Sequence, residues 1–236
     1  GIIFMSHRGL TINYPENTIN AYMDGIENGF NAIELDVVRS KDGELICSHN
    51  LELEVETNGH GYFKDYTIEE LKKIKTGVYS HPNRTQGVST LKEVFKAVPR
   101  NVFLNIEIKT ESWLDLDSVR ILNKYRKQGL IKHNYLVSTF NPFVVFYIRH
   151  FTRLKRVGFL IAYRDWVWMI NWIHPDAVHP TAELLSDSLI KRWKKNRLMI
   201  NTWTVNNLSA LKFCFKKDID GIITDSDKPL LFKDIL

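Results

Sequence analysis

Residues 32–38, AIELDVV, hold two acidic side chains inside an otherwise apolar run. Side chains two residues apart on a β-strand point to the same side, so Glu34 and Asp36 would emerge together with apolar residues behind them. Burying two like charges side by side is costly unless a cation neutralises them, and a hard divalent cation prefers oxygen ligands. The pair therefore predicts a metal site. The alternative is an edge strand whose acids face water.

Predicted strands and helices alternate around this stretch. Residues 2–6 are long enough for one buried strand, and the helix that follows is predicted to begin after Asn17 as its N-cap. On the other side, a Lys-Asp-Gly turn at 41–43 leads directly into a strand at 44–49. No helix fits between this strand and the acidic one, and a parallel crossover needs about a dozen residues, so we predict a hairpin.

Residues 50–90 are less regular than the chain on either side. Helices are predicted to begin at Thr67 and at Thr90. Each threonine is followed three residues later by a glutamate, Glu70 or Glu93, that completes a capping box. We interpret the whole segment as an insertion over one end of the fold.

The alternation resumes after residue 90. With the hairpin strand left out, eight strands are predicted, mostly followed by helices, and in 236 residues this is the pattern of a (β/α)8 TIM barrel. We expect a single domain over residues 1–236. A doubly wound sheet is the alternative, but it has no natural place for eight evenly spaced strands. The later strands are predicted at 102–108, 135–139, 156–161, 176–179, 198–203 and 221–224, and helices near 116–128, 142–150, 182–195 and 207–217.

The composition is that of a soluble globular protein, with 44% hydrophobic and 25% charged residues. The net charge of +5 suggests an anionic ligand or surface, but a solvated basic face such as 191–195 explains most of the excess. The two cysteines, Cys47 and Cys214, predict neither a disulfide framework nor a zinc site. No signal peptide or transmembrane run is visible, so we expect a cytoplasmic protein. A processed secreted or periplasmic form stays open, because the first residue is glycine.

Polar residues gather where the predicted barrel strands end, which is where barrel active sites lie. Glu107 and Lys109 end the third strand, so Glu34, Asp36 and Glu107 are three carboxylates on two adjacent strands. They predict a cage for one Mg²⁺ or Ca²⁺, with positions left for substrate and water. Arg8, after the first strand, and Lys109 would suit a phosphate group, or would be salt-bridge partners of the acids.

Two histidines belong to the same predicted mouth. His7 ends the first strand and His49 ends the hairpin strand, so the two could face each other. Imidazole titrates near neutral pH, and a pair can divide the work of taking a proton from an attacking oxygen and giving one to a leaving oxygen. A single histidine would usually be a structural residue. Other histidines have no such context and are expected on the surface or in loops: His60, His81, His133, His150 and His174.

Short motifs around these residues occur in order along the chain. They are His7-Arg8-Gly9, Pro15-Glu16-Asn17-Thr18, Glu34-Leu35-Asp36-Val37, Asp42-Gly43, His49, Glu107-Ile108-Lys109, Trp203-Thr204-Val205-Asn206 and Gly221-Ile222-Ile223-Thr224-Asp225. Each motif is weak alone, but the ordered set resembles the glycerophosphodiester phosphodiesterase family over nearly the whole chain. That family is similar to phosphatidylinositol-specific phospholipases C in using a (β/α)8 barrel.

The resemblance implies metal-dependent hydrolysis of small glycerophosphodiesters to sn-glycerol 3-phosphate and an alcohol, a reaction of lipid and glycerol metabolism. It implies that Glu34, Asp36 and Glu107 hold the metal. Arg8 and Lys109 would then contact the phosphate. A glycerol hydroxyl would attack phosphorus first and give a cyclic phosphate, which water then opens. Residues 50–90 correspond to the family's insertion, which helps close the substrate site.

The same resemblance implies that His7 and His49 are the acid/base pair and that Trp203 contacts the substrate. One departure affects this pair. The family usually has aspartate after the second histidine, whereas this chain has Asn50. Asparagine keeps the hydrogen bonding but loses the charge, which changes the tuning of His49 and the optimum pH.

An aromatic segment at 164–172, RDWVWMINW, follows the fifth predicted strand and should rim the mouth. Its three tryptophans could contact a choline head group, an acyl chain or a membrane surface, and lysophospholipids would then be candidate substrates. The alternative is a helix that packs its aromatic residues on the barrel.

Other functions stay open beside the first. One is a lysophospholipase D or sphingomyelinase D-like activity. Another is a barrel that binds phosphodiesters without turning them over, although the intact acid, histidine and lysine set argues against it. Nucleic-acid binding is not expected, because the basic runs lack a recognised module. No Gly-x-Ser-x-Gly, P-loop or Gly-x-Gly-x-x-Gly motif supports a serine nucleophile or nucleotide binding by those routes.

Overall fold

A computed structural model of the chain describes residues 1–227 and contains a closed barrel of parallel strands. Each barrel strand pairs with its neighbours in chain order, and β1 pairs with both β11 and β2, which closes the ring. The predicted TIM barrel is therefore confirmed. The strands are β1 (Ile3–His7), β2 (Ala32–Arg39), β6 (Phe103–Ile108), β7 (Tyr135–Thr139), β8 (Val157–Ile161), β9 (Ala177–Pro180), β10 (Met199–Thr202) and β11 (Gly221–Thr224).

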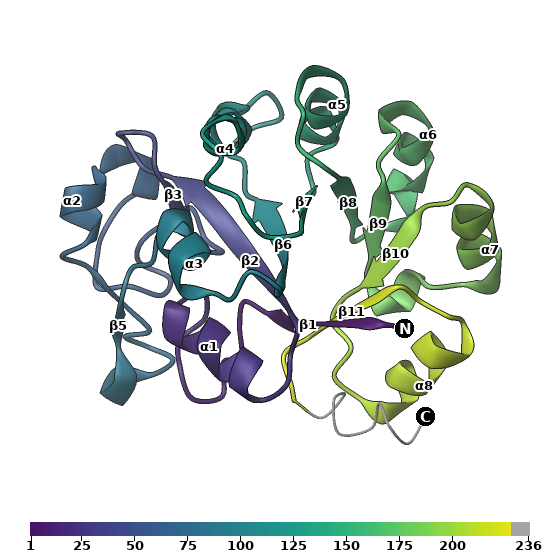
Figure 1. Cartoon of the computed structure of the whole chain (residues 1–236), viewed down its shortest axis with the longest axis horizontal. Coiled ribbons are helices and arrows are strands. Elements are labelled where there is room, and N and C mark those ends of the chain that lie inside the picture. The colour runs from purple at the N-terminus through teal and green to yellow at the C-terminus, as the bar shows by residue number, and fades with distance from the viewer. Residues whose placement is uncertain (228–236) are drawn as a thin grey trace.

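Helices surround these strands (Figure 1). Each packs an apolar face on the barrel: α7 buries Leu189, Ile190 and Trp193, while Lys191 and Arg192 of the basic run are exposed. That run is thus largely a solvated face of α7. The helices are α1 (Ile19–Glu27), α4 (Asp117–Lys127), α5 (Pro142–Phe151), α6 (Ile170–Ile173), α7 (Asp187–Lys195) and α8 (Leu208–Lys216).

The predicted hairpin is present, since β3 (Leu45–Cys47) pairs antiparallel with the end of β2. The chain after it forms short elements with a small core of their own, built from Val38, Ile46, Leu53, Phe63, Leu71 and Val88. Figure 1 shows α2 and β5 of this segment outside the ring of helices. Its elements are η1 (Phe63–Asp65), α2 (Ile68–Leu71), β4 (Lys75–Thr76), η2 (Pro82–Arg84), β5 (Gln86–Gly87) and α3 (Leu91–Ala97).

Both predicted capping boxes are confirmed. Thr67 caps α2 with Glu70, and Thr90 caps α3 with Glu93, each pair exchanging side-chain and backbone hydrogen bonds. These bonds satisfy backbone N–H groups that the first turn of a helix leaves free.

Two local predictions were wrong. The N-cap of α1 is Thr18 rather than Asn17, because Asn17 turns its side chain toward β2. The single helix predicted at 182–195 is divided into η4 (Ala182–Leu184) and α7, since Ser186 caps a new helix by accepting from Leu189 N–H. His133 lies in the loop before β7, as predicted, but it is buried there, with its Nε2 3.0 Å from the carbonyl oxygen of Val98.

Cys47 and Cys214 are free and buried. Among the helices of residues 1–227, none is long and apolar enough to cross a membrane.

Candidate active site

The strand register brings the polar residues of the first three barrel strands together. His7 of β1 lies opposite Glu34 of β2, and Asp36 of β2 lies opposite Glu107 of β6. Because parallel strands all end at the same rim of a barrel, these side chains meet at its carboxyl end. Sequence positions that are 100 residues apart therefore form one cluster.

Three buried carboxylates form the centre of this cluster. Glu34, Asp36 and Glu107 are only 2%, 1% and 6% exposed, and one oxygen of each lies within 4.8 Å of the others. Oε1 of Glu34 is buried and has no hydrogen-bond partner within residues 1–227. A buried oxygen that accepts no hydrogen bond is available as a metal ligand. Together with the two neighbouring carboxylates it forms a set of oxygen ligands that suits a hard divalent cation.

Two cations stand beside the carboxylates. Nζ of Lys109 lies 3.1 Å from Oδ1 of Asp36 and pairs with Oε1 of Glu107. Nε of Arg8 lies 3.5 Å from Oδ2 of Asp36, and its Nη1 donates to Glu16 at 2.7 Å. The predicted salt-bridge contacts are therefore real, and they hold both cations at the mouth of the barrel.

Charge balance within the cluster is uneven. Burial, and then the charge of Asp36, raise the pKa of Glu34 to about 8. Burial also raises the pKa of Glu107 above its ordinary value. Burial acts in the same direction on Asp36, but Lys109 and Arg8 outweigh it and hold the pKa of Asp36 below its ordinary value. Among the described residues, Glu34 thus has no lysine or arginine ion pair like those of Asp36, and its cationic partner is His7, whose Nε2 lies 3.9 Å from Oε2 of Glu34.

The two predicted histidines have opposite electrostatic environments. Burial lowers the pKa of His7, but the hydrogen bond to Asp225 and the charge of Glu34 outweigh it, so the pKa of His7 is raised. Its Nδ1 lies 2.5 Å from Oδ1 of Asp225. Burial and the charge of Lys109 lower the pKa of His49, whose Nδ1 lies 3.3 Å from Oδ1 of Asn50. A pair whose pKa values are pushed apart can serve as acid and base at one pH.

A cavity of about 160 Å³ opens above the carboxylates. Trp203 contributes to its wall, where Nε1 donates to the carbonyl oxygen of His179 at 2.8 Å and the indole packs edge-to-face on Phe140. Asp36 lies beneath the cavity rather than in its lining. The lining residues are His7, Arg8, Glu34, His49, Asn105, Glu107, Lys109, Phe140, Leu160, Trp203 and Ile223.

Asn17 is a site residue that the sequence reading did not identify. Its Nδ2 donates to Oδ2 of Asp36 at 2.9 Å, and its Oδ1 accepts from the Asp36 backbone N–H and from the hydroxyl of Tyr22. The residue takes a left-handed conformation, with φ of 55°, that turns it toward β2. Its place in the Pro-Glu-Asn-Thr motif was the only signal available in the sequence.

Asp225 also joins the site, from the end of β11. Besides His7 Nδ1, it accepts a hydrogen bond from Nδ2 of Asn206 at 2.8 Å. A carboxylate that holds one ring nitrogen of a histidine fixes the tautomer and directs the other nitrogen. Its position after a barrel strand was visible in the sequence, but its contact with His7 was not.

Gly9 allows the loop after β1 to approach α1. It has φ of +85°, and a Cβ there would lie 2.7 Å from the carbonyl carbon of Ala21. A side chain would therefore push apart the turn that carries His7 and Arg8.

The polar residues His179 of β9 and Asn201 of β10 lie outside the lining of the cavity. His179 is fully buried inside the barrel, where Nε2 lies 3.0 Å from Nδ2 of Asn201, and burial lowers the pKa of His179 to about 3. Gly158 of β8 leaves room for this ring, since a Cβ there would lie 2.5 Å from Nε2. His179 therefore supports the barrel interior and does not reach the cavity.

The sequence of this chain matches a family model and related proteins over nearly its whole length. The model of the glycerophosphoryl diester phosphodiesterase family matches residues 7–227. A glycerophosphodiester phosphodiesterase of Caldanaerobacter subterraneus is 31% identical over 234 residues, covering 97% of this chain and 96% of that protein.

Solved structures of related proteins have the same fold. A glycerophosphodiester phosphodiesterase of Thermotoga maritima is 28% identical with a TM-score of 0.79, covering 100% of this chain and 99% of that one. A phosphodiesterase of Oleispira antarctica, solved with the product sn-glycerol 3-phosphate, has a TM-score of 0.86 at 20% identity, with 98% and 96% coverage. The chain therefore belongs to the glycerophosphoryl diester phosphodiesterase family.

Proposed function

We propose that this protein hydrolyses glycerophosphodiesters to sn-glycerol 3-phosphate and an alcohol, with one divalent cation, Mg²⁺ or Ca²⁺. The observation that carries the proposal is a cavity bordered by two histidines, two cations and two carboxylates, with a third carboxylate, Asp36, converging on the other two beneath it. The family membership supports the reaction class, and the relatives named above support the substrate class.

Glu34, Asp36 and Glu107 would hold the cation. When bound, it supplies positive charge that polarises the phosphoryl oxygens and offsets the negative charge of the transition state. The unpartnered oxygen of Glu34 supports this assignment. The donor set contains oxygen atoms only, which favours Mg²⁺ or Ca²⁺ over zinc.

Arg8 and Lys109 line the cavity and would orient the phosphate. Both contact the carboxylate of Asp36 beneath the cavity, so each side chain is held in place before the substrate arrives. Fixed positive groups that already face the reacting phosphate reduce the reorganisation needed in the transition state.

His49 is the better base and His7 the better acid. Nδ1 of His49 faces Oδ1 of Asn50, so this nitrogen carries the hydrogen and Nε2 keeps its lone pair for the attacking hydroxyl. His7 carries a raised pKa and donates from Nδ1 to Asp225, so Nε2 holds the proton given to the leaving alcohol. The bond from phosphorus to the alcohol oxygen breaks as the new phosphorus–oxygen bond forms.

The test is release of sn-glycerol 3-phosphate from glycerophosphocholine, with and without a chelator. We expect release that requires a divalent cation, and loss of at least about a hundred-fold in kcat/KM for Glu34→Ala. Glu27→Ala, which changes an exposed glutamate of α1, is the matched control. Absence of release with every added divalent cation would contradict the proposal.

A further inference from the structure

An apolar cleft of about 250 Å³ adjoins the catalytic cavity. The cleft and the cavity share two wall residues, Phe140 and Leu160. All the residues that line the cleft are apolar or aromatic, and none carries a formal charge: Trp113, Phe140, Phe159, Leu160, Ala162, Tyr163 and Trp166.

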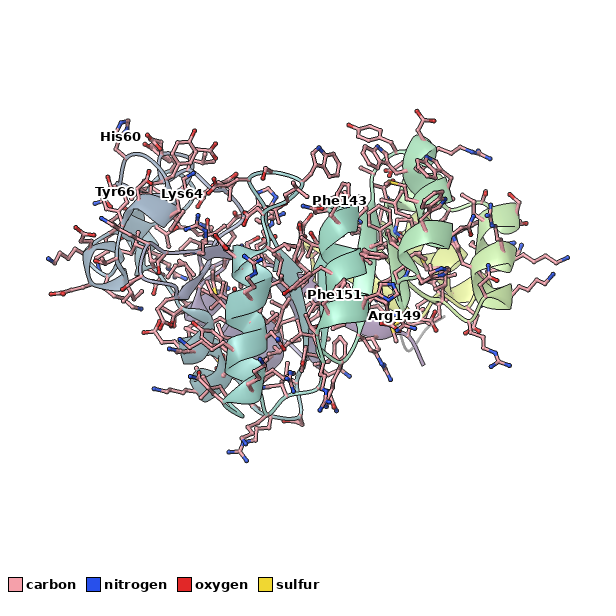
Figure 2. The ribbon with its side chains drawn as sticks, turned by 90° about the horizontal axis from the view of Figure 1, so that it is seen from above. His60, Lys64, Tyr66, Phe143, Arg149 and Phe151 are labelled. Atoms are coloured by element: carbon pink, nitrogen blue, oxygen red, sulfur yellow. The ribbon has the colours of Figure 1, made fainter. Side chains whose placement is uncertain are left out.

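Three successive strands build this cleft at their carboxyl ends. Trp113 lies in the loop after β6, Phe140 directly follows β7, and Trp166 lies in η3 (Arg164–Met169) after β8. The indoles of Trp113 and Trp166 stack with their centroids 5.4 Å apart. Trp113 also packs on Phe143, which Figure 2 shows at the opposite end of α5 from Arg149 and Phe151. The cleft is therefore part of the mouth of the barrel.

A second cleft, of about 270 Å³, has a different chemistry. It shares His49, Glu107, Lys109 and Phe140 with the catalytic cavity, and its lining includes an acidic residue, Glu52. The polar and apolar clefts have only Phe140 in common. A phosphate in the cavity would thus adjoin both a polar cleft and an apolar cleft, and both clefts include Phe140 in their lining.

We propose that the apolar cleft binds the acyl chain of a lysoglycerophospholipid, so that the protein also acts as a lysophospholipase D. The proposal rests on the function proposed above, because it uses the same carboxylates and histidines. Water and 1-acyl-glycerophosphocholine give 1-acyl-glycerol 3-phosphate and choline. The phosphorus–oxygen bond to choline breaks, its oxygen takes a proton, and the oxygen of water ends on phosphorus.

The lining of the cleft favours an acyl chain over a quaternary ammonium head group. A cationic group binds aromatic faces, but Trp113 and Trp166 each cover one face of the other. Nζ of Lys109 lies 5.9 Å from the centroid of Phe140 and would repel a second cation at this wall. The polar cleft, with Glu52, is the better place for choline, so the apolar cleft remains for the chain.

The first experiment uses a series of 1-acyl-glycerophosphocholines with short chains, which stay monomeric in water. Choline release is measured beside release from glycerophosphocholine, and the acylated phosphate product is identified by mass spectrometry. We expect kcat/KM to rise by up to about four-fold per methylene group until the cleft is full. Because the substrates are monomeric, adsorption to a lipid surface does not contribute.

Variants of the cleft test its role directly. Trp113→Ala removes part of the wall, and Ala162→Leu fills the space. We expect each to lower the ratio of kcat/KM for octanoyl-glycerophosphocholine to that for glycerophosphocholine by at least ten-fold. Trp172→Ala, which removes an exposed tryptophan outside the cleft, should leave the ratio unchanged.

The outcomes separate the two proposals. If neither substrate releases choline, the catalytic assignment itself fails. Release from glycerophosphocholine alone, with no gain from the acyl chain, overturns the acyl-chain cleft and leaves the catalytic assignment standing. An acyl-chain gain that survives in both cleft variants also overturns it, because the chain would then bind elsewhere.

Discussion

At the scale of single residues, the site is organised by which charges have partners. Asp36 has Lys109, Arg8 and Asn17 around it, whereas one oxygen of Glu34 has no hydrogen-bond partner in the part of the chain that the structure describes. His7 faces a carboxylate, but His49 faces an amide and a lysine charge. The roles proposed for these residues follow from such differences, since chemically identical side chains acquire different pKa values in different surroundings.

Asp225→Asn should move the alkaline limb of the pH profile. The hydrogen bond and charge of the carboxylate raise the pKa of His7, so the amide should lower that pKa. The acid must be protonated, and kcat/KM should therefore decline at a lower pH than in the wild type. The measurement is kcat/KM for glycerophosphocholine between pH 5 and pH 10. An unchanged alkaline limb would exclude His7 as the titrating acid.

Asn50→Asp should move the acidic limb of the pH profile of kcat/KM. A carboxylate beside Nδ1 of His49 would raise the pKa of this histidine, which burial and Lys109 hold below its ordinary value. The base must be neutral to accept a proton. As the pH is lowered, kcat/KM of the variant should therefore begin to fall at a higher pH than kcat/KM of the wild type. The same assay series measures this effect. Movement of the alkaline limb instead would mean that the roles of the two histidines are reversed.

At the scale of elements, strand register and helix caps hold these residues in place. The pairing of β2 with both β1 and β6 sets His7, Glu34, Asp36 and Glu107 side by side. A shift of one residue would turn both acids of β2 to the opposite face. The capping boxes at Thr67 and Thr90 begin the helices of the segment that follows the hairpin.

Glu93→Gln should destabilise the protein by about 1 kcal/mol near pH 7. Burial opposes ionisation of Glu93, but hydrogen bonds from Lys72 and from the Thr90 backbone outweigh it and lower its pKa. A carboxylate with a lowered folded-state pKa contributes stability above its unfolded pKa of about 4.5, and this is lost as the pH falls through the folded value.

Urea denaturation at a series of pH values measures the Glu93 effect. The difference between wild type and Glu93→Gln should shrink on acidification from pH 6 toward pH 3. Glu69→Gln, at an exposed position of α2, is the control and should show no such difference. A difference that is independent of pH would show that the charge of Glu93 does not contribute.

At the scale of the whole molecule, barrel closure brings distant parts of the chain to one rim. The pairing of β1 with β11 sets Asp225 against His7, which lies 218 residues earlier in the chain. The cavity and both clefts likewise draw their walls from loops after several different strands. Function at this rim therefore depends on the closed ring.

A divalent cation should stabilise the folded protein. At about 100 times the dissociation constant, binding to the native state alone adds about 2.7 kcal/mol, which for this size raises Tm by about 5–10 °C. Differential scanning fluorimetry with MgCl₂ or CaCl₂, against a chelator, measures the shift. Glu34→Gln should lose most of it, and Glu27→Gln should keep it.

The pH dependence of this stabilisation has a definite sign. Without the cation the pKa of Glu34 is about 8, and the carboxyl group must lose its proton to bind metal. Apparent affinity should therefore rise with pH until it passes that value. A stabilisation that is equal in both glutamate variants, or that weakens from pH 6 to pH 8, would contradict the assignment of Glu34.

The sequence by itself determined the barrel, because the alternation of apolar strands and helices and the polar strand ends are local patterns. It also predicted the three carboxylates, since Glu34 and Asp36 share a strand face and Glu107 ends the next barrel strand. Both capping boxes were predictable for the same reason, as the threonine and the glutamate lie three residues apart.

Only the tertiary structure decided the partners of these groups. The contacts of Asn17 with Asp36 and of Asp225 with His7 join different elements, and no local pattern encodes them. The opposite pKa shifts of His7 and His49 depend on burial and on charges from other strands. The two clefts at Phe140 likewise exist only where loops converge. Periodicity specifies which residues share a face, but distances between elements arise only when the barrel closes.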